Sequence, residues 1–194
     1  MELQNYPLEF VERTVSLIES LSADAESRGL EVTFLLNCLL GLIVATSENI
    51  ARCEIKALDK KILELDSKCL IPKKIAYIDL ANALKGYKKE INDKSLINQG
   101  DKVISFESKV CVNGYDQARN MKLKELLKKI RNGVAHQNLA PLNSDGKWAG
   151  VKIWNHSKEG IKDFEIEFEV AELRAFSIFL ASIYVDELKA NFKG

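Results

Sequence analysis

The sequence predicts an all-α protein, a bundle of four to five helices with a small β-hairpin before the C-terminal helix. Apolar residues recur at helical spacing over most of the 194 residues. One run, at 34–45, is apolar almost all round, as in a helix that other helices surround. Alternation of apolar and polar residues, the pattern of paired strands, is confined to residues 151–170.

The bulk composition predicts a single domain spanning residues 1–194. The chain is 46% hydrophobic and 29% charged, which is ordinary for a soluble globular protein and too apolar for a disordered one. Its 28 Lys and Arg residues balance its 28 Asp and Glu residues. No global positive field therefore attracts nucleic acid, and any affinity for RNA must come from a local patch.

The four cysteines lie far apart in the sequence and show no paired spacing. This pattern argues against a zinc cluster or a disulfide framework, so we expect no metal site and a cytoplasmic location in which thiols stay reduced. The N-terminus lacks the basic and apolar segments of a secretory signal. The run at 34–45 is shorter than the roughly 20 residues of a membrane helix, so no membrane contact is expected. The cysteines are Cys38, Cys53, Cys69 and Cys111.

Three helices are predicted in the first half of the chain. Residues 6–21 carry apolar side chains at helical spacing. Residues 31–65 are predicted to form a longer, central helix, first apolar nearly all round and then amphipathic. Pro72 can open a third helix over 72–87, because proline suits the first helical position.

The segment after the third helix is irregular before a fourth helix begins. The apolar pattern breaks up over 88–115, where 103–112 fits either a short hairpin or irregular structure. A helical stripe returns at about Asp116 and continues toward His136. Pro141 sets the outer limit of this helix.

The last part of the chain predicts the hairpin and a closing helix. Residues 151–170 alternate in polarity on either side of a polar loop at 155–162, as two paired strands do. Residues 171–192 carry a continuous apolar stripe at helical spacing, which predicts a helix that closes the bundle.

The segment 131–136, which reads Arg-Asn-Gly-Val-Ala-His, is the strongest candidate for chemistry. An arginine can form two parallel hydrogen bonds with a phosphate, and a histidine can transfer a proton near neutral pH. Together they suit phosphodiester cleavage. The structural alternative is that His136 only stabilises a helix C-terminus through the helix dipole. The other histidine, His156, is expected to be exposed and idle in the hairpin loop.

With this segment at the end of a predicted helix, the sequence resembles the higher eukaryotes and prokaryotes nucleotide-binding (HEPN) superfamily. Ribonuclease members of that superfamily carry an Arg-x4-6-His signature, often with a polar residue after the arginine, and Arg131, Asn132 and His136 match that form. The resemblance implies an endoribonuclease that acts on RNA as a homodimer, with the two signatures facing one cleft. It further implies a toxin of a toxin–antitoxin system, with an antitoxin protein as partner, or a phage-defence effector.

Two other functions remain open at this point. A non-catalytic HEPN module would bind a nucleotide or a protein partner without cleaving RNA. A plain helical interaction protein would carry the Arg-Asn-x3-His segment by coincidence. Intact Arg131, Asn132 and His136 favour the enzyme over both alternatives.

The spacing of the two reactive residues poses a geometric problem. At about 100° per residue, Arg131 and His136 point about 140° apart on a regular helix, whereas Asn132 and His136 share a face. Three arrangements would bring the groups together: the arginine wraps round the helix, Gly133 loosens the turn, or a second subunit completes the site. The family resemblance favours the second subunit.

The mechanism that we expect needs neither a metal nor a cofactor. A base helps the ribose 2′-hydroxyl to attack the adjacent phosphate, and a cation stabilises the charge that develops there. His136 would move the proton and Arg131 would hold the phosphate. Asn132 would orient the histidine or the scissile group. The need for a 2′-hydroxyl would make RNA, and not DNA, the substrate.

Four further residues are candidates on the helices around the segment. Lys124, Lys128 and Lys129 form part of a basic strip that could guide an RNA backbone, or simply the solvated face of an amphipathic helix. Glu48 interrupts the apolar pattern of the central helix and could face Arg131 or His136 as an acidic partner. Alternatively, Glu48 has no role in the site and only marks where the helix reaches solvent.

One position departs from a known subgroup of the family. Members that are controlled by a nucleotidyltransferase carry a modified tyrosine two positions after the histidine. Here that position is Asn138. Control by this modification is therefore not expected.

Overall fold

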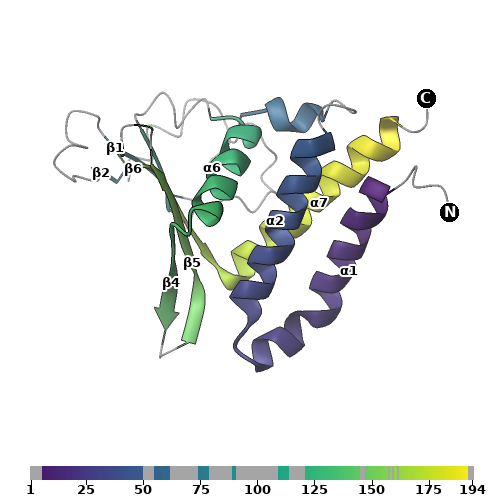
Figure 1. Cartoon of the computed structure of the whole chain (residues 1–194), viewed down its shortest axis with the longest axis horizontal. Coiled ribbons are helices and arrows are strands. Elements are labelled where there is room, and N and C mark those ends of the chain that lie inside the picture. Colours follow the sequence, from purple (N-terminus) through teal and green to yellow (C-terminus); the bar gives the residue numbers. More distant parts are fainter. Residues whose placement is uncertain are drawn as a thin grey trace, which may run out of the picture.

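A single sheet with helices on one side forms the described part of the chain in the computed structural model (Figure 1). The sheet has six strands in the order β2-β1-β3-β6-β5-β4. Strands β1 and β3 are parallel, and the other neighbours are antiparallel. The structure describes residues 6–49, 55–61, 74–78, 89–90, 109–113, 121–144, 147–156, 158, 160 and 162–191.

Along the described chain, three helices come first, three strands follow, and a fourth helix then precedes three more strands and the closing helix. The helices are α1 (Tyr6–Ser27), α2 (Glu31–Asn49), the short 3-10 helix η2 (Lys56–Asp59), α6 (Leu123–Ala135) and α7 (Val170–Asn191). The strands are β1 (Lys74–Ile78), β2 (Lys89–Glu90), β3 (Lys109–Asn113), β4 (Leu139–Ser144), β5 (Lys147–His156) and β6 (Lys162–Glu169).

The prediction of an all-α bundle is wrong, because the described residues contain this sheet. The alternation over 151–170 does correspond to two antiparallel strands, β5 and β6. They are interior strands of a larger sheet rather than an isolated hairpin, since β4 pairs with β5 and β3 pairs with β6. Two isolated strands bury little surface, so further pairing is the stable way to cover their edges.

The predicted helix over 72–87 is wrong where the structure describes it. Residues 74–78 form strand β1, which pairs in parallel with β3, a partner more than 30 residues away. Ile75 and Ile78 are three positions apart, a spacing that fits a helix, but Lys74–Ile78 is also a short run rich in strand formers. Pairing with a distant strand determined that these residues form a strand, and the spacing of nearby residues cannot predict such pairing.

The predicted central helix, 31–65, is shorter in the structure. Helix α2 ends at Asn49, and residues 56–59 form a separate 3-10 helix. No glycine or proline marks this interruption in the sequence. Helix α1 extends six residues beyond the predicted end at 21, and α7 closely follows the predicted closing helix. Helix α6 begins at Leu123, so the predicted helix from about Asp116 is wrong at residues 121–122, and residues 116–120 lie outside the described ones.

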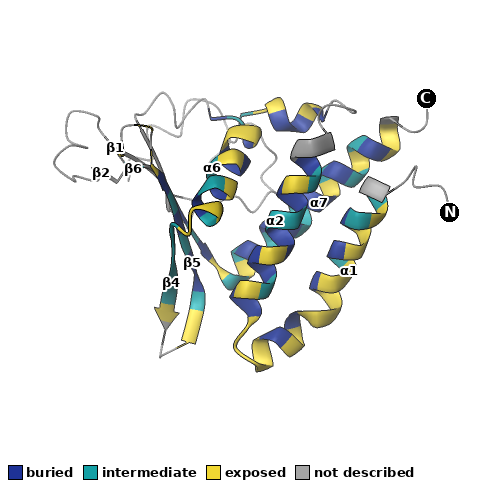
Figure 2. Cartoon of the chain, viewed as in Figure 1, coloured by how far each residue is buried: buried dark blue, intermediate teal, exposed yellow. Residues whose placement is uncertain are grey.

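The core lies between the inner face of the sheet and helices α2, α6 and α7 (Figure 2). Alternate residues of β5 and β6 point into it, because side chains of a strand alternate between faces. The rings of Phe168 on β6 and Phe176 on α7 stack with centroids 5.4 Å apart. The buried residues of the two strands are Val151, Ile153, Phe164, Ile166 and Phe168.

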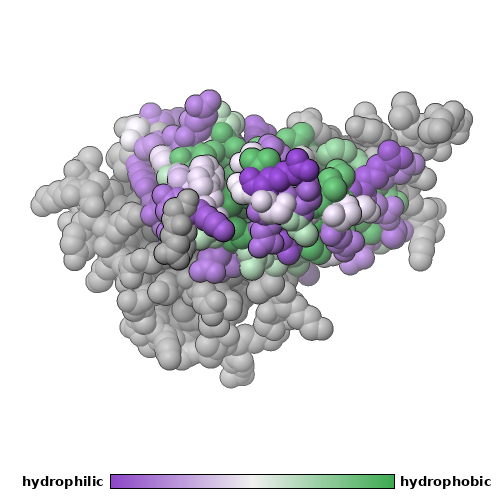
Figure 3. All heavy atoms as spheres, turned by 90° about the horizontal axis from the view of Figure 1, so that it is seen from below, coloured by the Kyte–Doolittle hydropathy of each residue, from purple (hydrophilic) through white to green (hydrophobic). Residues whose placement is uncertain are grey.

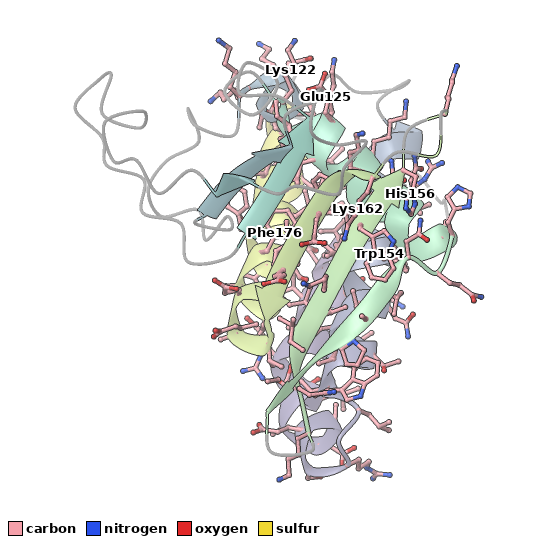
Figure 4. The ribbon with its side chains drawn as sticks, turned by 90° about the vertical axis from the view of Figure 1, so that its left-hand side faces the viewer. Lys122, Glu125, Trp154, His156, Lys162 and Phe176 are labelled. Carbon is pink, nitrogen blue, oxygen red and sulfur yellow. The ribbon has the colours of Figure 1, made fainter. Side chains whose placement is uncertain are left out.

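The opposite face of the sheet carries charged residues paired across β5 and β6. Glu165 is only 1% exposed and forms ion pairs with Lys162 and Lys152, and Lys152 also pairs with Glu167. Trp154 and Lys162 project from neighbouring strands (Figure 4), and the Lys162 Nζ lies 5.1 Å from the indole centroid. Glu165 can be buried as a charged carboxylate because a lysine lies on each side of it.

Exposed apolar side chains are scattered among polar ones on the face seen from below (Figure 3). The large exposed hydrophobic residues of α1 and of the turn after it are Leu17, Leu21 and Leu30.

Among the described helices, none is both long enough and apolar enough to cross a membrane. Cys38 of α2 is buried with a free thiol, and burial raises the pKa of that thiol.

We expect the Phe168–Phe176 contact to be a major part of the attachment of α7 to the sheet. Replacing Phe176, which is fully buried, by alanine should lower the free energy of unfolding by about 3–5 kcal/mol, because it removes an aromatic ring and leaves a cavity. Urea denaturation measures this loss. Leu17→Ala on α1, where the leucine is 46% exposed, is the control and should change stability by less than about 1 kcal/mol. Equal effects of the two changes would contradict the packing described here.

Candidate active site

Helix α6 carries the Arg-Asn-x3-His segment and separates its apolar and charged residues onto two faces. The exposed stripe includes Lys124, Lys128 and Arg131, which follow one another at spacings of four and three. The buried residues recur at similar spacing on the other face and turn it toward the core. They are Leu123, Leu126, Leu127, Ile130 and Gly133.

The start of α6 is held against the η2 segment. The Leu123 amide donates a hydrogen bond of 3.0 Å to the Lys60 carbonyl, and Lys61 pairs with Lys122 in an isolated bridge. The Lys122 amide donates to the Glu125 carboxylate at 3.1 Å, which satisfies one of the amides that a helix start leaves unpaired. The η2 segment therefore lies beside the first turn of α6.

The end of α6 is closed by a defined hydrogen-bonded turn. The His136 amide bonds to the Asn132 carbonyl at 3.0 Å, that of Gln137 to Val134 at 3.0 Å, and that of Asn138 to Gly133 at 2.8 Å. Gln137 has φ of 56°, so this is the left-handed capping turn that usually contains glycine. His136 is thus the last residue before the chain reverses into β4.

Gly133 allows this end of the helix to lie directly on strand β5. A Cβ atom at Gly133 would come within 2.5 Å of the Ile153 Cγ2 atom and 2.6 Å of the Trp154 carbonyl oxygen. No side chain fits at those distances. The Trp154 amide also donates a hydrogen bond of 3.0 Å to the Asn138 carbonyl, just after the turn. One contact with β5 before His136 and one after it therefore fix its backbone relative to the sheet.

The three side chains of the predicted motif are accessible to different degrees. Arg131 and His136 are exposed, and Asn132 is partly buried. Within the described part of the chain, none of the three side chains is hydrogen bonded to another. The donors that a phosphate would need are therefore present and not engaged by their motif partners.

A cavity of about 440 Å³ opens beside Arg131, between α2, η2 and α6. Its apolar lining comes from three elements that meet here. The charged lining comes from one stripe of α6. The described residues that line it are Ile43, Thr46, Leu58, Lys124, Glu125, Leu127, Lys128 and Arg131.

Asp59 of η2 modifies the charge at the rim of this cavity. Its carboxylate lies 2.5 Å from the Lys124 Nζ and 3.4 Å from the Lys122 Nζ. The hydrogen bond from Lys124, followed by that from Lys122, lowers the pKa of Asp59, and the same contact raises the pKa of Lys124. Both groups therefore stay charged at neutral pH, and Lys124 is engaged by a fixed anion.

The remaining predicted site residues are placed as follows. Glu48 belongs to the last turn of α2, but its side chain lies outside the described residues. Lys129 is not among the described residues that line the cavity, and its contact with RNA remains a prediction. His156 lies exposed at the end of β5 (Figure 4). Within the residues that the structure describes, no group of three or more His, Cys, Asp or Glu side chains could hold a metal ion.

The sequence did not reveal the cavity or the part that η2 plays in it. Leu58 fits the apolar stripe of a continuous helix 31–65, in which it would lie far from α6. The interruption after α2 instead brings Leu58 and Asp59 back beside Lys124. A pair of apolar residues between lysines, at 56–61, was the only local signal.

Comparison with known proteins places the chain in one family. A family model described as HEPN pEK499 p136 matches residues 1–191 of the 194-residue chain. The chain belongs to the HEPN family. This confirms the resemblance inferred from the Arg-Asn-x3-His segment at the level of the family. Searches of curated proteins and of solved structures gave no match. At a coarse level, HEPN membership fits a nuclease or toxin-like role.

We expect the close approach at Gly133 to be essential to this HEPN fold. Gly133→Ala should lower the free energy of unfolding by about 1–3 kcal/mol, because the added methyl group meets the backbone of β5. Gly41→Ala on α2 is the matched control, since its Cβ would meet only the Phe10 ring, at 3.2 Å. Alanine also favours a helix by up to about 1 kcal/mol, so this variant should be neutral or stabilised. Urea unfolding compares the two, and a neutral Gly133→Ala would contradict the described contact.

Proposed function

We propose that this HEPN protein is a metal-independent endoribonuclease in which His136 transfers protons and Arg131 binds the scissile phosphate. The observation that supports it is the exposure of both side chains at the same end of α6, which its contacts with β5 hold in place. Catalysis needs groups that are accessible and held in position before substrate arrives. The end of α6 has both properties.

The reaction follows from the chemistry of these groups. His136 in its neutral form takes the proton from a ribose 2′-hydroxyl, and the 2′-oxygen attacks the adjacent phosphorus. The bond from phosphorus to the 5′-oxygen of the next nucleotide breaks, and the protonated His136 gives its proton to that oxygen, which returns the histidine to its neutral form. The products are a 2′,3′-cyclic phosphate and a 5′-hydroxyl. Arg131 stabilises the negative charge on the phosphate oxygens, and the Asn132 amide orients the reacting groups.

A second copy of the chain would complete this site. On a regular helix, residues spaced as Arg131 and His136 are point about 140° apart, so one phosphate does not easily reach both side chains of one α6. Two copies related by a two-fold axis would place the arginine of one beside the histidine of the other, with RNA between them. We therefore propose that the enzyme is a homodimer.

The biological role that fits such an enzyme is that of a toxin or a phage-defence effector. An enzyme that cleaves RNA without a metal or a cofactor needs a separate means of control. An antitoxin protein that covers the end of α6 would supply it. Asn138 in place of a modifiable tyrosine argues against control by nucleotide transfer to that position.

The first expected result concerns His136. Removing a general acid–base residue should reduce the rate of RNA cleavage by about 100-fold or more, so His136→Ala should cleave labelled single-stranded RNA at least that much more slowly than wild type. His156→Ala is the matched control and should retain activity. The assay contains excess chelator, and the wild-type products should end in 2′,3′-cyclic phosphate. RNA with a 2′-deoxy substitution at the cleaved position should resist cleavage.

Other outcomes would decide against the enzyme. Equal cleavage by wild type and His136→Ala would mean that the activity belongs to another site or another protein. Binding of RNA without cleavage of any tested substrate would identify a non-catalytic HEPN module.

The second expected result concerns the shared site. Arg131→Ala and His136→Ala proteins should each be inactive, but mixing them should restore about a quarter of the wild-type activity, because half of the dimers then contain one intact arginine–histidine pair. The measurement is cleavage after the two variants are allowed to exchange subunits, alongside the molar mass in solution. A dimer that recovers no activity would contradict a site assembled from one arginine and one histidine of different copies.

A further inference from the structure

The turn that ends α6 has a counterpart with the same hydrogen bonds at the end of α1. In each turn, the amide of a left-handed residue bonds to the carbonyl three positions before it. The amide of the next residue bonds to the carbonyl five positions before its own position. The left-handed residue is Gly29 after α1 and Gln137 after α6, with φ of 68° and 56°. Both helices therefore end in the same capping motif, one with glycine and the other with glutamine.

Glutamine is an unfavourable residue at this position of the motif. A Cβ atom crowds the backbone in the left-handed region, so the position is usually occupied by glycine and sometimes by asparagine. Among the residues that the structure describes, Gln137 is the only one other than glycine with a positive φ. The hydrogen bond from the Trp154 amide to the Asn138 carbonyl ties this turn to β5. The chain therefore holds Gln137 in a strained conformation.

No contact in the described part of the chain compensates for this strain. The Gln137 side chain is exposed, and it forms no hydrogen bond with any described residue. A side chain at Gly29 would also have room, since nothing lies within 4 Å of a Cβ atom there, so open space alone does not account for the glutamine. Strained residues of this kind cluster at functional sites. Gln137 directly follows His136, with the two Cα atoms about 3.8 Å apart.

We infer that Gln137 is a specificity-determining residue whose carboxamide binds an unpaired adenine beside the scissile phosphate. The carboxamide donates from its nitrogen and accepts at its oxygen, so it matches the N6 donor and the N7 acceptor of adenine. It carries no charge, which suits a base edge better than the phosphate proposed to bind Arg131. Unpaired RNA exposes such edges. The inference rests on the proposed function, because it takes cleavage beside His136 as given.

The first test is the base preference of cleavage. Single-stranded RNA of randomised sequence is cleaved in excess chelator, and the product ends are sequenced. Wild type should cleave beside adenine about ten times faster than beside cytosine, because one matched pair of hydrogen bonds discriminates by about this factor. Gln137→Glu should shift the preference toward cytosine, since a carboxylate accepts from the cytosine N4 amine. Gln137→Gly should lose the preference. A wild type without a preference, or variants that keep it, would overturn the inference.

Thermal unfolding separates base recognition from a structural role of the side chain. Gln137→Gly should raise the Tm by about 2–4 °C, because glycine relieves the strain at this φ. Gly29→Gln is the matched control in the same motif. It should lower the Tm by a similar amount and cleave with the wild-type preference. A lower Tm for Gln137→Gly would mean that the side chain stabilises the turn, and would overturn the inference.

A binding measurement distinguishes failure of this inference from failure of the proposed enzyme. Short RNAs carry adenine or cytosine on both sides of one phosphate, with a 2′-deoxy sugar that prevents cleavage there. His136→Ala protein should bind the adenine RNA about ten times more tightly, and adding Gln137→Gly should abolish the difference. This result, without cleavage of any RNA by wild type, would support base recognition and refute the ribonuclease. Cleavage that depends on His136 but shows no base preference would refute the recognition and support the enzyme.

Discussion

The direct contact of Gly133 with strand β5 fixes the end of α6, where Arg131, Asn132 and His136 of the candidate site lie. Without a side chain at this position, the backbone of α6 reaches the Trp154 carbonyl and the Ile153 side chain. The hydrogen bond from the Trp154 amide to the Asn138 carbonyl continues that contact beyond the turn. Arg131 precedes this anchor and His136 follows it. Their separation is therefore a property of the helix–sheet packing as much as of the sequence motif.

The sequence predicts best those elements whose pattern is local and strongly periodic. Helix α7 carries a continuous apolar stripe and appears close to its predicted limits, and α6, with its amphipathic stripe, ends just before His136 as predicted, although it begins later than the predicted start at about Asp116. The alternation at 151–170 likewise marks β5 and β6. In each case the burial of one face agrees with the local preference for helix or strand. Tertiary contacts therefore did not change the secondary structure that the local sequence favours.

The errors fall where partners lie far away in the chain. Strand β1 pairs with β3, so the decisive hydrogen bonds join residues that no local window contains together. The break after α2 has the same origin, because contact of the η2 segment with α6 replaces a continuation of the helix. The motif could be found from residue types alone. The cavity beside it could not, since Leu58 reaches Lys124 and Arg131 only through that break.

The buried carboxylate of Glu165 has a consequence for strand alignment. A slip of β5 past β6 by one residue would turn every side chain of the slipped strand to the other face. Lys152 would then turn toward the core, and Glu165, which is 1% exposed, would keep only Lys162 of its own strand as a partner. Such an arrangement is strongly disfavoured even where the native ion pairs add little net stability. The pair of Lys152 and Glu165 across the two strands thereby selects one alignment of β5 on β6, and that alignment fixes the height at which α6 meets β5.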